Sequence, residues 1–159
     1  MSDAPANIHG TAIVVAGAGF VFLGPSGSGK SALAFSCLAE ARALGLAAAL
    51  IADDRVLISR QGGRVLAACP PSIAGLIELR GTGILRQPHL SPAPLDFAVQ
   101  PVDLAVAERL PPEDERTEIL PGLFLPLVRL AATARNPLAI LMAKVPQSFG
   151  EAASGAPAP

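Results

Sequence analysis

The pattern of apolar and polar positions in the first part of the chain predicts a hairpin, a helix and a further strand. Residues 11–16 and 20–23 are apolar runs rich in β-branched and aromatic side chains, with glycines between them, as in a β-hairpin. Apolar residues then recur at helical spacing over residues 33–44, and Gly45 is the residue type that commonly ends a helix. Residues 46–52 are continuously apolar, which is typical of a strand buried on both faces in a parallel arrangement.

Glycine and proline divide the following part of the chain. Residues 56–58 and 64–66 flank a glycine turn and predict a second hairpin. Residues 76–85 predict one extended segment, in which charged and apolar side chains alternate. Residues 88–101 are rich in proline and predict an extended or loop-like segment.

The last third of the chain has a charged stretch between apolar ones. Residues 103–107 predict a short strand, and the charged, proline-containing residues 108–118 predict a mobile surface loop. A helix is expected over residues 138–144, with Asn136 as its N-cap and Pro137 at its first position.

Length and composition indicate one α/β domain without a general affinity for nucleic acid. At 159 residues the chain has the size of a single domain, which we expect over residues 1–145. Residues 146–159 are rich in Ala, Gly, Ser and Pro and predict a flexible C-terminal tail. The formal net charge is −1, and aromatic residues make up only 4%, with no Trp or Tyr. A nucleic-acid partner is therefore not expected.

The chain also shows no pattern of a secreted or membrane protein. The residues before His9 contain no Lys or Arg, unlike a signal peptide, and no uninterrupted apolar run reaches membrane-spanning length. The predicted compartment is the cytoplasm, with no membrane partner. Cys37 lies on the apolar face of the predicted helix and is expected to be a small buried hydrophobic residue, whereas Cys69 is assigned no chemistry.

A phosphate-binding motif lies between the predicted hairpin and the predicted helix. It matches the pattern G-x-x-x-x-G-K-[ST] at every fixed position. Its glycines let several backbone N–H groups point at one anion, and the helix start adds a positive dipole end. We expect Lys30 to reach the β- and γ-phosphates of ATP and the Ser31 hydroxyl to ligate Mg²⁺. The expected nucleotide-binding residues are Gly24, Pro25, Ser26, Gly27, Ser28, Gly29, Lys30 and Ser31.

Acidic residues follow the next predicted strand. Asp53 and Asp54 come directly after residues 46–52, and in a right-handed strand-helix-strand unit both strand ends open onto one crevice. We therefore expect one or both of these carboxylates to face the phosphates and Mg²⁺, although without the phosphate-binding loop a solvated turn would be the preferred interpretation. Side chains alternate along an extended chain, so the two acids should have different roles. Glu78 and Arg80 precede a Gly-x-Gly pattern that indicates a close backbone approach.

The chain resembles the catalytic domain of bacterial HPr kinase/phosphorylase. The resemblance extends from about residue 8 to residue 144 and is most specific in residues 77–84. Further matches are the Ile-His-Gly before the hairpin, the phosphate-binding motif and residues 52–56. Weaker matches are the segment 108–110, which looks like the family's mobile arginine loop, and residues 128–129 with 135–136, which look like its C-terminal motif.

The resemblance implies a protein serine kinase whose fold is close to phosphoenolpyruvate carboxykinase, with a mixed sheet and a β-hairpin before the P-loop. Its substrates would be ATP with Mg²⁺ and a serine of HPr, or of a nitrogen-system relative of HPr. Several members also catalyse the reverse phosphorolysis. Such proteins form homo-oligomers, commonly hexamers. Carried over to this chain, His9 is an active-site residue, Asp53 the acid/base, Arg109 a residue near the transferred phosphoryl, and Asp54 and Glu78 are contacts of Mg²⁺.

Two departures from the family pattern alter these expectations. The usual N-terminal domain of the family is not in this sequence, so regulation that depends on it is not expected. The C-terminal motif has residues 130–134 where the family has Pro-Gly between its arginines, which favours the kinase activity over the phosphorylase activity.

Two alternatives remain open from the sequence. A small-molecule kinase would use the same phosphate-binding loop but transfer phosphate to a metabolite. A non-catalytic ATP sensor would keep Gly29, Lys30 and Ser31 without needing the full set of acids. The presence of Asp53, Asp54 and Glu78 therefore favours an enzyme over a sensor.

Overall fold

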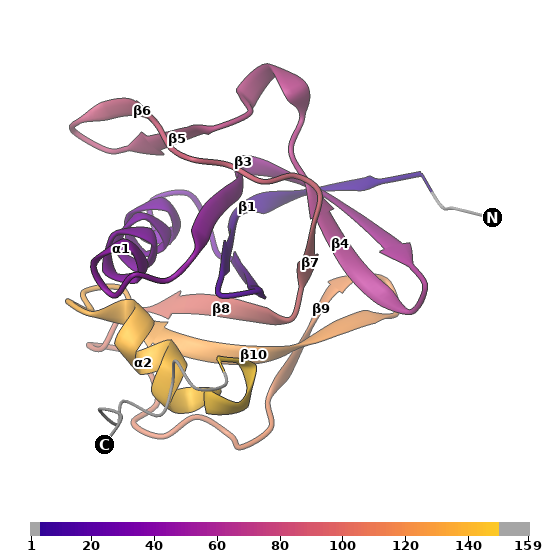
Figure 1. Ribbon diagram of the computed structural model, residues 1–159. Coiled ribbons are helices and arrows are strands. Elements are labelled where there is room, and N and C mark those ends of the chain that lie inside the picture. Colours follow the sequence, from indigo (N-terminus) through magenta and orange to yellow (C-terminus); the bar gives the residue numbers. More distant parts are fainter. Residues whose placement is uncertain (1–3, 150–159) are drawn as a thin grey trace, which may run out of the picture.

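The computed structural model describes residues 4–149 (Figure 1). It contains an eight-stranded mixed sheet in the order β7-β4-β3-β1-β2-β8-β10-β9 and a separate two-stranded sheet, β5-β6. The predicted α/β class with a mixed sheet is confirmed. The strands are β1 Ala6–Val15, β2 Ala18–Phe22, β3 Ala48–Gln61, β4 Arg64–Ala68, β5 Leu76–Leu79, β6 Gly83–Arg86, β7 Ala93–Leu95, β8 Phe97–Val102, β9 Arg116–Leu120 and β10 Leu123–Ala131. The helices are α1 Lys30–Ala43 and α2 Pro137–Lys144, with 3₁₀ turns η1 Pro71–Ile73 and η2 Pro146–Ser148.

The predicted hairpin before the phosphate-binding loop is present, but its first strand has a second role. β1 pairs antiparallel with β2 and also antiparallel with β3, so it lies between them. β2 and β3 consequently point in the same direction without being neighbours, and the end of β2 lies level with Asp53 in the middle of β3, because Phe22 and Asp53 both pair with Thr11. The expected strand-helix-strand unit therefore exists with a third strand inserted into it.

β3 is longer than the sequence predicted. We expected a strand to end at Ala52, whereas β3 continues through the acidic pair as far as Gln61. The reason is β1, whose ten residues provide a ladder partner along most of β3. The pairing changes register between Ala12 and Ile13, which face Ala52 and Leu50, so Ile51 has no partner and forms a bulge.

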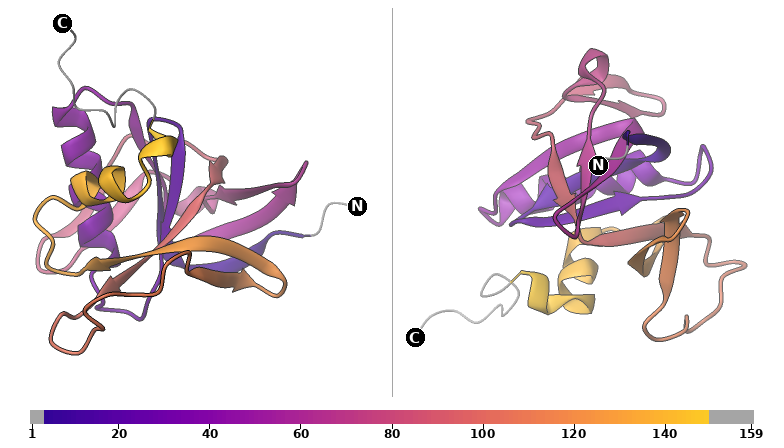
Figure 2. Two further views of the ribbon diagram at one scale, coloured as in Figure 1. Left: turned by 90° about the horizontal axis from the view of Figure 1, so that it is seen from below. Right: turned by 90° about the vertical axis from the view of Figure 1, so that its right-hand side faces the viewer.

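The two faces of the main sheet are covered differently. α1 and α2 lie on the same side of the sheet (Figure 2), and their apolar residues pack with those of β1, β2, β8 and β10 in one core. The second core is built only from strand residues, because the sheet curls and brings β3, β4 and β7 toward β10. The Arg60 guanidinium connects the two ends of the curl by donating a hydrogen bond of 3.0 Å to the carbonyl of Gly122.

The middle of the chain contains more paired strands than the sequence predicted. The segment expected to be extended over residues 76–85 is the β5–β6 hairpin, which stands apart from the main sheet at the top of Figure 1. Gly81 and Gly83 have φ values of 80° and 123°, which allow the turn that a side chain would disfavour. The proline-rich segment 88–101, expected to be extended or loop-like, is largely extended and contains β7 and β8. β8 lies between β2 and β10, parallel to both, because its apolar side chains are buried on both faces.

The segment after β8 also differs from expectation. Residues 103–107 form a turn rather than a strand, since the backbone amides of Val106 and Ala107 donate to the carbonyl of Asp103. The charged residues 108–115 form an irregular segment leading to β9.

The second predicted hairpin is confirmed. Residues 56–58 and 64–66 pair antiparallel as parts of β3 and β4.

The C-terminal helix begins where the sequence predicted, but its cap is different. Asn136 lies at the N-cap position and makes no side-chain cap. The carboxylate of Glu40 in α1 accepts hydrogen bonds from the amides of Leu138 at 2.9 Å and Ala139 at 3.2 Å. A distant side chain therefore satisfies donors that a helix start leaves free, which sequence spacing alone does not reveal.

The predicted tail begins too early. Residues 146–148 form η2, and Phe149 is buried, with its ring centroid 5.9 Å from that of Phe20. An aromatic side chain that can complete the core favours order over a free end. The remainder of the expected tail, residues 150–159, lies outside the described residues.

Candidate active site

The residues singled out at the strand ends and in the glycine loop meet in a cleft of about 290 Å³. The cleft lies where the start of α1, the middle of β1 and β3, and the β5–β6 hairpin come together. Its lining residues are His9, Thr11, Ser26, Gly27, Gly29, Lys30, Ser31, Ala32, Asp53, Asp54, Glu78, Leu79 and Arg80. The glycine loop and both acids are thus brought to one side of the molecule, as the sequence predicted.

The loop has the backbone geometry of an anion cradle. Gly24, Gly27 and Gly29 have φ values of 139°, 82° and 100°, which glycine adopts without a steric penalty. Lys30 is only 7% exposed, and its Nζ donates to the carbonyls of Gly24 at 2.8 Å and Pro25 at 2.9 Å. The ammonium group is therefore held inside the loop, where a bound phosphate could replace these carbonyls as its partner.

The electrostatic environment of Lys30 fits this role. Burial lowers the pKa of the Lys30 ammonium, because a charged group loses solvation there, and nearby Arg80 lowers it further. Asp53 and Asp54 act in the opposite direction. An anionic ligand in the loop would supply the charge partner that a buried ammonium group lacks.

Asp53 is buried and tightly held. Its Oδ1 accepts hydrogen bonds from the hydroxyls of Ser31 at 2.7 Å and Thr11 at 2.8 Å, and its Oδ2 accepts one from the backbone amide of Glu78 at 2.9 Å. The residue is 7% exposed. Three donors from three different elements therefore fix this carboxylate at the back of the cleft.

Asp54 differs from Asp53 in exposure and in backbone conformation. Its side chain is 68% exposed, and its Oδ1 lies 3.1 Å from Nδ1 of His9, which is also 3.1 Å from the Asp54 carbonyl oxygen. Asp54 has a φ of 71°, which is unusual for a residue other than glycine. Neighbouring side chains in a regular strand point to opposite faces, so this conformation explains how both acids line one cleft.

Sequence reasoning gave no role to two polar residues of the cleft. Thr11 is completely buried, and the signal for it was a polar residue inside an otherwise apolar strand. Arg80 reaches over the loop, with Nη2 3.3 Å from the Ser26 hydroxyl. A side chain at Gly27 would meet the Arg80 guanidinium at 3.2 Å, so the glycine makes room for this cation.

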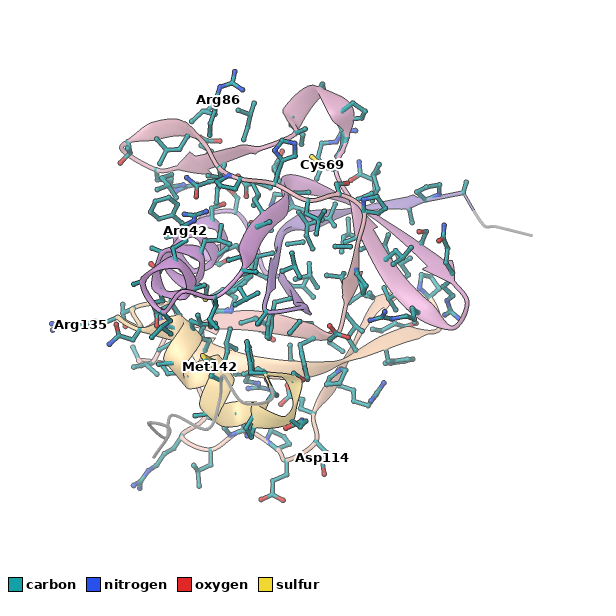
Figure 3. The ribbon with its side chains drawn as sticks, viewed as in Figure 1. Arg42, Cys69, Arg86, Asp114, Arg135 and Met142 are labelled. Carbon is teal, nitrogen blue, oxygen red and sulfur yellow. The ribbon has the colours of Figure 1, made fainter. Side chains whose placement is uncertain are left out.

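Among the described residues, Glu78 and Arg109 are two predicted site residues whose side chains make no hydrogen bond with the acids or the glycine loop. Glu78 lines the cleft, but the contact it makes with Asp53 uses its backbone amide. Arg109 is exposed and does not line the cleft, and Asp114 of the same segment lies at the opposite end of Figure 3 from Arg86 of the β5–β6 hairpin.

The arginines of the weaker C-terminal motif are also away from the cleft. Arg129 forms an ion pair of 2.9 Å with Glu115. Arg135 is exposed and points away from the molecule (Figure 3). In this conformation, neither side chain reaches the bound phosphates that the cleft would hold.

Comparison with known proteins shows the family. A family model described as HPr Serine kinase C-terminal domain matches residues 3–90, which include the glycine loop, both acids and Arg80. The chain belongs to this family. HPr kinase/phosphorylase from Burkholderia lata is 32% identical over 147 residues, which cover 86% of this chain and 44% of that protein. The same-named protein from Mycoplasmopsis pulmonis is 36% identical over 78 residues, covering 49% of this chain and 23% of that protein.

The fold agrees with the family assignment. The HPr(Ser) kinase/phosphatase of Coxiella burnetii has a similar structure, with a TM-score of 0.67 over 89% of both chains and 19% sequence identity. The chain spans less than half the length of curated family members such as those from Burkholderia lata and Cupriavidus necator. Within residues 4–149, no helix is long and apolar enough to cross a membrane.

The cleft fits a nucleotide with a divalent cation better than a cation alone. Among the residues that the structure describes, no three His, Cys, Asp or Glu side chains are arranged to hold a metal ion. Mg²⁺ is commonly bound by one or two carboxylates or hydroxyls together with phosphate oxygens of a substrate. Ser31 and Asp53 could supply such contacts, and the hydroxyl of Ser28, buried without a partner in the loop, is a further free polar group there.

Proposed function

We propose that this domain is an ATP-dependent protein serine kinase that phosphorylates HPr or a nitrogen-system HPr-like phosphocarrier. The observation that carries the proposal is the hydrogen bond between Ser31 of the glycine loop and Asp53 of β3, beside the buried Lys30. This arrangement unites a phosphate cradle with a carboxylate at the position where a divalent cation would bind. The names of the relatives support the acceptor.

The glycine loop and Lys30 would bind the nucleotide. ATP supplies the transferable γ-phosphoryl group when bound, and Mg²⁺ offsets its negative charge. The loop amides surround the phosphates, and the Lys30 ammonium exchanges the carbonyls of Gly24 and Pro25 for phosphate oxygens. Arg80, above Ser26, adds a second cation at the rim of the cleft. Because phosphoryl transfer needs little covalent work from the protein, positioning and charge carry the catalysis.

The contacts of the two acids support a division of roles that differs from the expectation. The family resemblance implied the acid/base role for Asp53 and the metal role for Asp54. Asp53 is buried and accepts three hydrogen bonds, one of them from the hydroxyl of Ser31. These contacts suit a carboxylate that orients the metal site. Asp54 is exposed, as a base must be to meet a serine on another protein.

In this scheme Asp54 receives the proton. Its Oδ1 contacts His9, so Oδ2 would take the proton from the acceptor serine hydroxyl. The serine oxygen would bond to the γ-phosphorus while the bond from that phosphorus to the bridging oxygen breaks, and ADP leaves. His9 orients the carboxylate. In phosphorolysis, Oδ2 would return the proton to the serine oxygen as inorganic phosphate attacks the phosphorus and pyrophosphate is released. Glu78 stays in the proposal as a further Mg²⁺ contact, through water, at the rim of the cleft.

The proposed role of Arg109 and the proposed homo-oligomer both involve more than the cleft of one chain. Arg109 lies outside the cleft, so a role near the transferred phosphoryl requires its segment to approach a cleft, either its own or that of another copy. We propose that the domain forms a homo-oligomer, with a hexamer as the first arrangement to test by light scattering. ATP and the phosphocarrier place the proposed activity in the cytoplasm.

The decisive experiment combines purified protein, ATP, Mg²⁺ and the HPr-like protein of the same organism. The proposal predicts a phosphoserine on the acceptor, identified by mass spectrometry. Asp54→Asn should abolish transfer while nucleotide binding is retained, and Asp53→Asn should weaken Mg²⁺-dependent binding as well. The reverse pattern would restore the roles expected from the sequence. ATP binding without phosphoserine would support a sensor, and ATP consumption that needs a metabolite would support a small-molecule kinase.

A further inference from the structure

Thr11 has an environment that the proposed chemistry does not yet explain. Within residues 4–149, the buried polar or charged residues are Thr11, Lys30 and Asp53, and all of them line the same cleft. Lys30 and Asp53 already have roles in binding phosphate and metal. Thr11 is completely buried at the back of the cleft, in the middle of β1.

The position of Thr11 follows from the sheet register. Thr11 and Asp53 are directly opposite each other in the antiparallel β1–β3 ladder, so their side chains lie on the same face. The Thr11 hydroxyl donates to Asp53 Oδ1 at 2.8 Å, and the Ser31 hydroxyl donates to that same oxygen at 2.7 Å. The two hydroxyl oxygens are 3.4 Å apart.

This geometry determines what each group can still do. A hydroxyl has one proton to donate, and Ser31 directs its proton to Asp53, which leaves the lone pairs of Ser31 Oγ available as metal ligands. The direction of that proton depends on where Oδ1 lies. Thr11, anchored in β1, and the Glu78 amide hold the two ends of the carboxylate and so determine its plane.

We propose that Thr11 is a positioning residue for the divalent cation of the bound nucleotide. Thr11 holds the Asp53 carboxylate so that the lone pairs of Ser31 Oγ point toward the metal. This inference rests on the proposed use of ATP with Mg²⁺. Groups that orient metal ligands through hydrogen bonds commonly change metal affinity about 10- to 100-fold when they are removed. The Thr11 hydroxyl is such a group, because it donates to Asp53 from β1, a strand in the interior of the main sheet.

The test uses Thr11→Val, which replaces the hydroxyl by a methyl group of similar size, and Thr11→Ser, which keeps the hydroxyl. Binding of a non-hydrolysable ATP analogue is measured by calorimetry over a series of Mg²⁺ concentrations. We expect Thr11→Val to raise the Mg²⁺ concentration for half-maximal binding about tenfold. Thr11→Ser should remain close to the parent protein. Binding without Mg²⁺ should be the same in all variants.

Two further measurements separate this role from simple packing. If Thr11→Val fails to fold, Thr11→Ala is compared with Thr11→Ser, since both lack the methyl group and differ only in the hydroxyl. In a Ser31→Ala background, loss of the Thr11 hydroxyl should produce no additional change in the Mg²⁺ requirement, because the ligand it positions is gone. An unchanged Mg²⁺ requirement after removal of the Thr11 hydroxyl overturns the inference, as does an equal loss of binding with and without Mg²⁺.

The outcome does not depend on the protein acceptor. A shift in the Mg²⁺ requirement without any phosphoserine on the HPr-like protein supports the role of Thr11 and counts against the proposed kinase. Phosphoserine formation with an unshifted Mg²⁺ requirement supports the kinase and rejects the role of Thr11.

Discussion

Ser31 and Asp53 join the start of α1 to β3 through a hydrogen bond of 2.7 Å from the serine hydroxyl to carboxylate Oδ1. The bond connects the end of the phosphate-binding motif with the acidic pair, two features that are separated in sequence by the whole of α1. It sets the spacing between the anion cradle and the acids. Disturbing one side of the cleft should therefore affect the other.

Replacing Lys30 by Ala should reduce ATP affinity and phosphoryl transfer about 100-fold or more, since it removes the buried cation of the loop. Calorimetry of nucleotide binding and an acceptor phosphorylation assay measure the two effects. The matched control is Lys144→Ala, which removes an exposed lysine at the end of α2. Binding that survives in Lys30→Ala at the parent level would contradict the proposed phosphate site.

Substitutions at Asp54 should show that its backbone conformation lowers the stability of the protein when any residue other than glycine is there. Asp54→Gly and Asp54→Ala both remove the carboxylate and its contact with His9, but only glycine accepts a φ of 71° without a steric penalty. We expect the Gly variant to have a free energy of unfolding about 1 kcal/mol higher than the Ala variant. Urea denaturation of both proteins tests this, and equal stabilities would mean that the positive φ is not under strain.

Glu40→Ala should lower the free energy of unfolding by about 1 kcal/mol, because two amides at the start of α2 lose their acceptor. Glu40→Gln keeps an acceptor oxygen without the charge and should cost less. Denaturant unfolding followed by circular dichroism measures both changes. If both variants have the same free energy of unfolding as the parent protein, these hydrogen bonds do not stabilise the contact between α1 and α2.

The two cysteines should differ in reactivity. Burial is the main cause that raises the pKa of the Cys37 thiol, and Glu40 raises it further, while partial burial raises the pKa of Cys69. Because their pKa values are raised, both thiols are protonated at neutral pH. Alkylation requires the thiolate, so both should react slowly there. Iodoacetamide should modify Cys69 first and faster as pH rises, and Cys37 only after unfolding. Mass spectrometry of digests reads out each site, with Cys69→Ser as the control.

Local chemistry made the phosphate-binding loop predictable. Residues 24–31 carry the glycines, the lysine and the serine that an anion cradle needs, and these act through backbone conformations and charges that neighbours in sequence provide. The hairpin before the loop and the strand leading to the acids follow from continuous apolar runs, and α1 follows from apolar residues at helical spacing. The sequence predicted less where a segment's partners are distant. β8 is an example, because the prolines of residues 88–101 indicated an extended or loop-like segment and gave no sign of its place between β2 and β10.

The sequence by itself determined the phosphate-binding motif, the α/β class and the identity of the acids, because those properties depend on residue type and short-range periodicity. Only the tertiary structure decided that β1 lies between β2 and β3, that Thr11 faces Asp53, and that Asp54 has the left-handed conformation with which both acids line the cleft. These relationships depend on strand order, register and the left-handed conformation at Asp54. Pairing between distant segments sets them, and it leaves no repeating pattern along the chain.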